Sequence, residues 1–170
     1  MLELLRKRRS IRKFKKERID RAKIEGLKEA ALRSPSSRNM RPWRFFFVED
    51  GEVIRQLSAC KEHGASFLKD APLAVVVCGD ENESDVWIED CSIAALILHL
   101  TAESLGLAGC WIQVRKRHCS AEMSSEDYVK KVLDIAGSLK VLAIVAIGLP
   151  DEVKAGHPAE KLDYGKIITR

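Results

Sequence analysis

The chain has 170 residues, of which 46% are hydrophobic and 32% charged, a balance typical of one globular domain with a core of its own. No apolar stretch approaches the roughly 20 residues of a membrane-spanning helix, and the first residues lack the apolar region of a secretory signal, so we expect a cytoplasmic protein. The formal net charge is +4. Of the 29 basic and 25 acidic residues, nine basic and one acidic lie in residues 6–18, which leaves 20 basic against 24 acidic elsewhere. The positive excess therefore belongs to one segment.

Five cysteines stand at positions 60, 78, 91, 110 and 119, an odd number without a Cys-x-x-Cys pair. A structural zinc site needs closely spaced ligand pairs, and the adjacent His118 and Cys119 do not supply one. We therefore expect reduced thiols and no metal site.

The first third of the chain predicts two helices and one strand. A short helix is expected over Leu2–Lys7, and a better one over residues 19–33, where Asp20 can cap the start. Residues 34–39 carry serines and a proline and predict a loop. The aromatic residues of Trp43–Val48 predict a strand.

The middle of the chain alternates between segments with helical spacing and segments typical of strands. Residues 51–60 have helical spacing, and the valine-rich residues 71–78 predict a buried strand, followed by an acidic turn over residues 79–85. Residues 88–105 predict the longest helix, which is apolar over much of its circumference. Such a helix lies at the centre of a fold or at a subunit interface.

The last third predicts a strand over residues 107–114, a polar loop over residues 115–125 and a helix over residues 126–133. A fourth strand is expected over residues 140–147, followed by a tail without a strong period. Helices and strands alternate unevenly, so an α+β arrangement of one sheet with packed helices is favoured over a doubly wound fold.

The basic segment contains Arg8-Arg9-Ser10-Ile11-Arg12-Lys13-Phe14. Guanidinium groups bind phosphate through paired hydrogen bonds, and a serine hydroxyl adds a donor. Alone, this run fits a solvated charged face equally well.

Two further segments have chemistry of their own. Residues 34–43, Ser-Pro-Ser-Ser-Arg-Asn-Met-Arg-Pro-Trp, form a polar loop that suits the edge of a flat heteroaromatic ring, although an ordinary capped turn explains it too. Residues 106–113 read Gly-Leu-Ala-Gly-Cys-Trp-Ile-Gln, and their two glycines allow the backbone to approach a neighbouring group closely. The end of a helix followed by a buried strand explains the same segment equally well.

Together and in this order, the three segments resemble the motifs of the nitroreductase family of FMN enzymes. Its opening Arg-Arg-Ser-x-Arg-x-Phe is matched by residues 8–14, its Ala-Pro-Ser-x-x-Asn-x-Gln-Pro-Trp by residues 34–43, and its Gly-Leu-Gly-x-Cys-Trp-Ile by residues 106–112. The last strand with its Gly-Leu-Pro turn, and the tail at residues 160–164, are similar as well.

The resemblance implies one domain over residues 1–170 with a sheet of about four to five strands flanked by helices, forming an intertwined homodimer with FMN at the subunit interface. The residues it places on the phosphate and ribityl chain are Arg8, Arg9, Ser10 and Arg12, joined by Lys161 of the tail. The residues it places around the ring, partly from the partner subunit, are Pro35, Ser36, Ser37, Asn39 and Arg41, with the backbone of Trp111, Ile112 and Gln113 near the reactive edge.

Several positions depart from the family pattern. Arg41 replaces glutamine, Ala108 and Gln113 replace glycines, and Ala136 replaces a proline. Arg41 could alter the flavin edge or receive an anionic substrate, and residues 115–125 leave little room for a substrate lid. The identity of the electron acceptor stays open.

We therefore expect an FMN-dependent oxidoreductase that takes a hydride from NADH or NADPH and reduces a small organic acceptor, such as a nitroaromatic or a quinone, by a ping-pong mechanism. The chemistry belongs to the cofactor, so no catalytic side chain is expected. His99, in an apolar helix, is interpreted as a hydrogen-bonded core residue. One alternative is an FMN carrier or sensor without turnover. Another alternative is a nucleic-acid-binding module that uses the basic arm. The net negative charge of the rest of the chain counts against this alternative.

Overall fold

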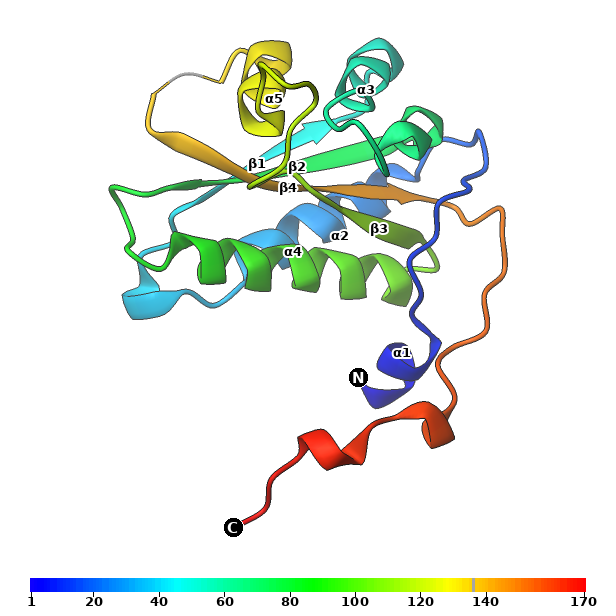
Figure 1. Cartoon of the computed structure of the whole chain (residues 1–170). Helices are drawn as coiled ribbons and strands as arrows, with labels where there is room; N and C mark the ends of the chain where they lie inside the picture. The colour runs from blue at the N-terminus through cyan, green and yellow to red at the C-terminus, as the bar shows by residue number, and fades with distance from the viewer. Residues whose placement is uncertain (136) are drawn as a thin grey trace.

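The computed structural model describes residues 1–135 and 137–170; Ala136, where the family has proline, lies outside the described residues. Helices and strands alternate along the chain (Figure 1). The helices are α1 (Leu2–Lys7), α2 (Arg21–Leu32), α3 (Gly51–Leu57), α4 (Trp87–Ser104) and α5 (Ser125–Leu133). The strands are β1 (Trp43–Val48), β2 (Leu73–Asp80), β3 (Ala108–Gln113) and β4 (Leu139–Gly148).

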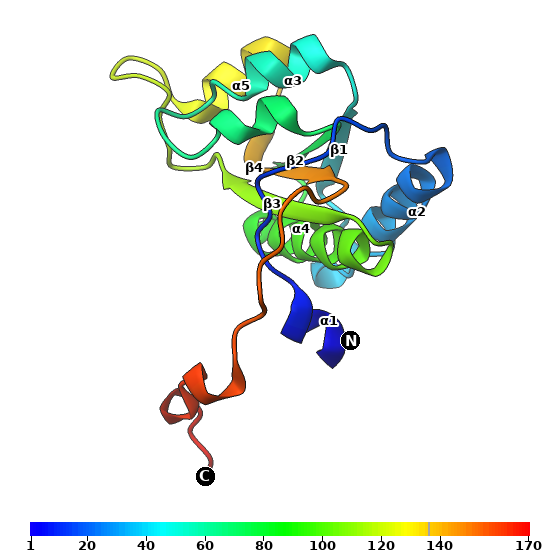
Figure 2. The ribbon, with the colours of Figure 1, turned by 90° about the vertical axis from the view of Figure 1, so that its right-hand side faces the viewer.

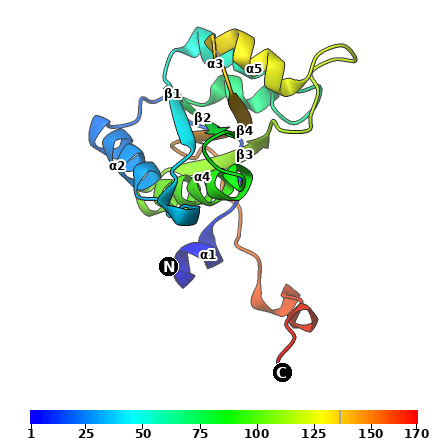
Figure 3. The same ribbon diagram turned by 90° about the vertical axis from the view of Figure 1, so that its left-hand side faces the viewer.

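The strands form one antiparallel sheet in the order β1-β2-β4-β3. The two central strands are almost fully buried, as expected for the valine- and isoleucine-rich runs that they contain. Helices cover both faces, with α2 and α4 on one side and α3 and α5 on the other (Figures 1 and 3). The result is the predicted α+β sandwich, with four strands.

Alternate side chains of the sheet supply two separate cores, because successive residues of a strand point to opposite faces. In β2, Val75 and Val77 pack with α2 and α4, whereas Ala74 and Val76 pack with α3 and α5. Helix α4 covers the centre of its face and is buried along Ala94, Ala95 and Leu98. It fulfils the expectation of a central helix.

Several predicted boundaries are wrong. Helix α2 begins at Arg21 instead of residue 19. Strand β2 begins and ends two residues later than expected, and it extends at its end because Gly79 and Asp80 pair with Lys140 and Leu139 before the acidic turn begins. Helix α3 ends at Leu57 instead of residue 60, because Ala59 N and Cys60 N donate to carbonyls three residues back.

The segments at the two ends of the chain run side by side next to β3. Lys15 N donates to Leu149 O at 2.9 Å, and Asp151 N donates to Lys13 O at 2.9 Å. Beyond this pairing, α1 and the last residues extend away from the α4 side of the body, as Figures 1 and 2 both show. Among the described residues, no helix combines the length and the apolar character that a membrane crossing requires.

Candidate functional site

The predicted phosphate-binding run lies across the start of β3. Ser10 forms a bridge with Gly109, and Ile11 N donates to Gly109 O at 3.1 Å. The same carbonyl lies 2.9 Å from Nε2 of His99, which is buried in α4 and therefore donates through a protonated Nε2. Burial lowers the pKa of His99, so the ring stays neutral. Helix α4 and strand β3 thus fix the backbone of the run together.

A carboxylate behind the run holds its backbone in place. Glu152 Oε1 accepts from Arg12 N at 2.6 Å, from Lys13 N at 3.2 Å and from Lys154 Nζ at 2.9 Å. The bond from Arg12 N, followed by the bond from Lys154, lowers the pKa of Glu152 to about 2. Lys154 Nζ also donates to Ser10 O at 3.0 Å. The sequence did not indicate these two residues, because only the pairing of the chain ends brings them to the run.

The donor groups of the run fit a phosphate. The guanidinium groups of Arg8, Arg9 and Arg12 form no ion pair with a carboxylate in residues 1–135 and 137–170. Arg9 donates to Ala155 O, and Arg12 lies over the ring of Phe67 at 5.7 Å. A cavity of about 320 Å³ beside the run has a mixed lining, with the cations Lys7, Arg9 and Lys154 and the carboxylates Glu103 and Glu152. Guanidinium groups without a carboxylate partner are suited to bidentate phosphate binding.

Beyond the bridge at Gly109, strand β3 continues along an open edge of the sheet, because β4 is its only neighbouring strand among the described residues. Ile112 is buried in the core, so its side chain is unavailable and only its backbone can border a ligand. Trp111 and Gln113 are half-buried on the opposite face, and Trp111 Nε1 donates to Gln113 Oε1 at 2.9 Å. Gln113 Nε2 in turn donates to Arg115 O at 3.0 Å.

The polar loop before β1 is fixed by a buried carboxylate. Ser37 N donates to Asp90 Oδ1 at 2.8 Å, and Asp90 lies in the first turn of α4. Ser36 Oγ accepts from Arg41 N at 2.9 Å, and Arg41 Nε donates to Asn39 Oδ1 at 2.8 Å. The φ angles of Asn39 and Arg41 are 57° and 53°, a region that residues other than glycine adopt at a cost. Hydrogen bonds therefore fix the conformation of the loop, and Pro35 is exposed at its start.

The two predicted halves of the site lie at opposite ends of α4. The loop contacts Asp90, whereas the basic run is held through His99, nine residues further along. At a rise of 1.5 Å per residue, they are about 13 Å apart along the helix. Figure 3 shows the segment before β1 beside the first turns of α4. Lys161 is exposed, and the tail that contains it extends away from the body of the molecule (Figure 2). One chain therefore brings the run and β3 together, but not the loop or Lys161.

The chain is similar to known proteins over almost its whole length. The sequence profile of the nitroreductase family matches residues 5–62 and 56–149. The solved structure of an FMN-dependent nitroreductase from Clostridium difficile R20291 superposes on this chain with a TM-score of 0.97. The two sequences are 42% identical, and the match covers 99% of this chain and 98% of the other. An NADH dehydrogenase from Thermus thermophilus is 36% identical over 95% of this chain and 91% of its own. An iodotyrosine deiodinase from Thermotoga neapolitana is 23% identical over 95% of both chains. The chain belongs to the nitroreductase family.

Proposed function

We propose that the chain is an FMN-dependent oxidoreductase that takes a hydride from NADH or NADPH and passes it to a small organic acceptor by a ping-pong mechanism. The observation that carries the proposal is the run Arg8–Arg12, whose guanidinium groups have no carboxylate partner among the described residues while its backbone is fixed by Gly109 and Glu152. The chemistry that FMN supplies when bound is two-electron transfer between substrates that use the same site in turn.

The residues of the run have two tasks in this proposal. Arg8, Arg9 and Arg12 neutralise the phosphate, assisted by the hydroxyl of Ser10. Their positive charge also favours added negative charge on the nearby ring. The backbone of Trp111–Gln113 borders the ring along the open edge of β3. No side chain is required to transfer a proton or to attack the substrate.

A second copy of the chain completes the proposed site. Ile93 and Leu96 leave 41% and 50% of their surface exposed on α4, and apolar residues of the tail, such as Ile167, are exposed as well. These surfaces fit a homodimer in which the 35–41 loop of one copy approaches the run of the other. That pairing joins the two halves of the site that α4 separates within one chain.

The proposed acceptor is small, because residues 115–125, which follow β3, leave little room for a large substrate lid. The relatives named above include a nitroreductase and an iodotyrosine deiodinase, so related chains differ in the acceptor that they reduce. Arg41 lies exposed on the rigid loop and could pair with a negatively charged group of the acceptor. Nitroaromatic compounds and quinones are therefore the first acceptors to test.

The test is an anaerobic titration of the purified protein. We expect a yellow protein that releases FMN when denatured, whose visible absorbance is bleached by NADH or NADPH and restored by a nitroaromatic or a quinone. Flavin that stays oxidised with both donors would indicate a carrier or sensor instead. A colourless protein that does not bind added FMN would contradict the proposal altogether.

A further inference from the structure

A second cationic pocket lies at the other end of β3 from the basic run. It is an open cavity of about 450 Å³ between the segment after α3 and the segment after β3. The residues that line it are Lys61, Glu62, His63, Lys116, Arg117 and His118. Three of these side chains carry a permanent positive charge and one a negative charge, so the pocket has a net positive charge and suits an anion.

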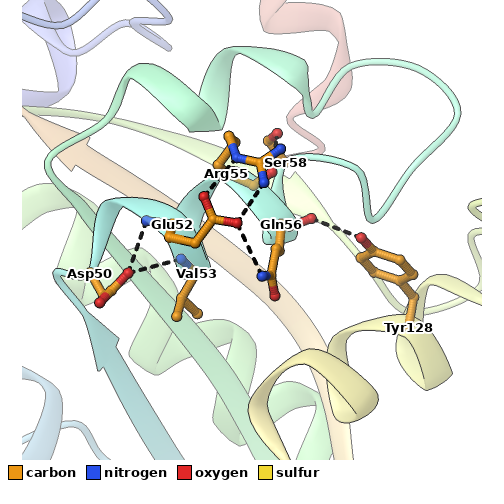
Figure 4. A network of polar contacts seen from close by, with 7 residues as sticks. All are labelled: Asp50, Glu52, Val53, Arg55, Gln56, Ser58 and Tyr128. Carbon is orange, nitrogen blue, oxygen red and sulfur yellow. Dashed lines mark hydrogen bonds and ion pairs between the residues drawn. The ribbon is translucent and has the colours of Figure 1, made fainter.

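Backbone bonds hold the two walls of this pocket together. Glu62 N donates to His118 O at 3.4 Å, and Ser125 N donates to Arg117 O at 2.8 Å. Tyr128 of α5 donates to Gln56 O at 3.1 Å and so ties α5 to the end of α3, just before the first wall (Figure 4). The pocket is therefore formed before any ligand arrives, which lowers the entropic cost of binding.

The cations of the pocket are available for a ligand. Some exposed cations elsewhere are paired with carboxylates of their own helix, for example Lys28 with Glu25 at 2.9 Å. Within the part of the chain that the structure describes, no carboxylate forms an ion pair with Lys61, Lys116 or Arg117. In this respect they match the guanidinium groups of the basic run.

The position of the pocket indicates which anion it takes. The run is attached at Gly109, near the start of β3, and the strand ends at Gln113, shortly before the pocket residues Lys116 and Arg117. At about 3.3 Å per residue, the strand spans about 13 Å from Gly109 to Gln113, and the two clusters lie at the opposite ends of this segment. The segment Trp111–Gln113, which borders the flavin ring in the proposed function, lies between them. In the proposed function the run binds the phosphate of the cofactor FMN. The hydride donor NADH or NADPH also contains phosphates, and the run does not account for these.

We propose that this second cationic pocket binds the phosphates of the reduced nicotinamide dinucleotide, with its nicotinamide directed along β3 towards Trp111–Gln113. The inference rests on the proposed function. It assigns donor recognition to Lys116 and Arg117, which follow the flavin segment directly in the chain. A hydride donor that lacks phosphates makes no use of the pocket.

The test compares donors with and without phosphates in the Lys116→Ala/Arg117→Ala double variant. The control is Arg21→Ala/Lys131→Ala, which removes two exposed cations elsewhere and keeps the net charge matched. Flavin bleaching is followed in anaerobic stopped flow with NADPH, with NADH and with 1-benzyl-1,4-dihydronicotinamide, which has the same reactive ring without phosphates. Binding of the unreactive analogue tetrahydro-NADPH is measured by titration calorimetry.

In the double variant, we expect the half-saturating NADPH or NADH concentration and the dissociation constant of tetrahydro-NADPH to rise by about tenfold or more. The limiting bleaching rate, the FMN content and the rate with the phosphate-free donor should stay unchanged. Equal losses with all donors, or unchanged dinucleotide binding, overturn the inference and leave the proposed function intact. If no donor bleaches the wild-type flavin, both are rejected.

A second measurement needs no variant. In the wild-type protein, added salt should raise the half-saturating NADPH concentration steeply and leave the rate with the phosphate-free donor nearly unchanged, because salt screens exposed charges. Salt-independent NADPH binding would count against the pocket.

Discussion

Gly109 is the residue on which the placement of the basic run depends. Its carbonyl accepts from both Ile11 N and His99 Nε2, so the strand, the helix and the run meet at one oxygen. A methyl group at position 109 would lie 3.0 Å from the His99 ring and 3.1 Å from Ala146 O, closer than most side chains approach, so these neighbours would have to move. The close approach favours glycine at this position.

Glu152 gives the run a dependence on pH. Its pKa in the folded chain is about 2, against a usual value of 4.5, so its contribution to stability is complete above about pH 4.5 and is lost as the pH falls towards 2. We expect Glu152→Gln to be less stable than the wild type at neutral pH, and the difference to shrink between about pH 5 and pH 2. Urea unfolding across this range measures it.

The control for this prediction is Glu160→Gln, which changes an exposed carboxylate of the tail. It should leave the free energy of unfolding unchanged at every pH. A Glu152→Gln protein whose unfolding curve follows that of the wild type from neutral to acid pH would show that the carboxylate does not hold the run.

At the scale of single residues, the sequence supplied the candidate phosphate donors but not the residues that hold their backbone. Arg8, Ser10 and Arg12 stand in a recognisable order, so they could be named from the sequence. Glu152 and Lys154 follow the last strand by a few residues and have no motif of their own. They reach the run only because the two ends of the chain pair beside β3, and a contact between residues 140 positions apart has no local signal.

At the scale of elements, periodicity and capping were enough to predict the five α-helices and four strands found among the described residues. Asp20 caps α2 as expected, accepting from Ala22 N at 2.7 Å. The errors lie at boundaries that pairing decides. Gly79 and Asp80 read as a turn, but β4 is long enough to pair with both, and this extends β2. Propensity is a weak guide wherever a neighbouring strand supplies hydrogen bonds.

Helix α3 provides a test at this scale. Asp50 accepts from Glu52 N at 2.8 Å and Val53 N at 3.0 Å, and so caps the helix that Tyr128 ties to α5 (Figure 4). We expect Asp50→Ala to lower the free energy of unfolding by about 1 kcal/mol, and Asp50→Asn to keep most of it, because asparagine also caps helices. Equal losses in both variants, measured by urea unfolding, would show that the negative charge rather than the cap matters.

At the scale of the whole molecule, the class of fold was predictable and the strand order was not. Uneven alternation of helices and strands favoured an α+β sandwich, but β2 and β4 lie next to each other although α4, β3 and α5 separate them in the chain. The sequence also did not indicate that the two halves of the predicted site lie at different positions along α4. The family resemblance, now confirmed, supplied the idea of a site shared between subunits; the split within one chain supports it.

The exposed apolar face of α4 tests whether two copies form the site. We expect Ile93→Glu/Leu96→Glu to convert a dimer into a monomer in sedimentation experiments and to lose most of its FMN, with the helical circular dichroism retained because both side chains are exposed. Leu32→Glu, an equally exposed apolar residue on α2, is the control and should stay dimeric. A dimeric double variant with a full complement of flavin would contradict a shared site.

The assignment of the basic run as the phosphate site is tested most directly by the affinity of the Arg8→Ala/Arg12→Ala apoprotein for FMN. Quenching of flavin fluorescence measures this affinity. The matched control is Lys15→Ala/Lys16→Ala, which removes two exposed cations from the same basic segment. The account predicts a loss of about 3 kcal/mol or more for the arginine variant, roughly a hundredfold in the dissociation constant, and little change for the lysine variant. An unchanged FMN affinity in the arginine variant, or an equal loss in both, would contradict the assignment of the basic run as the phosphate site.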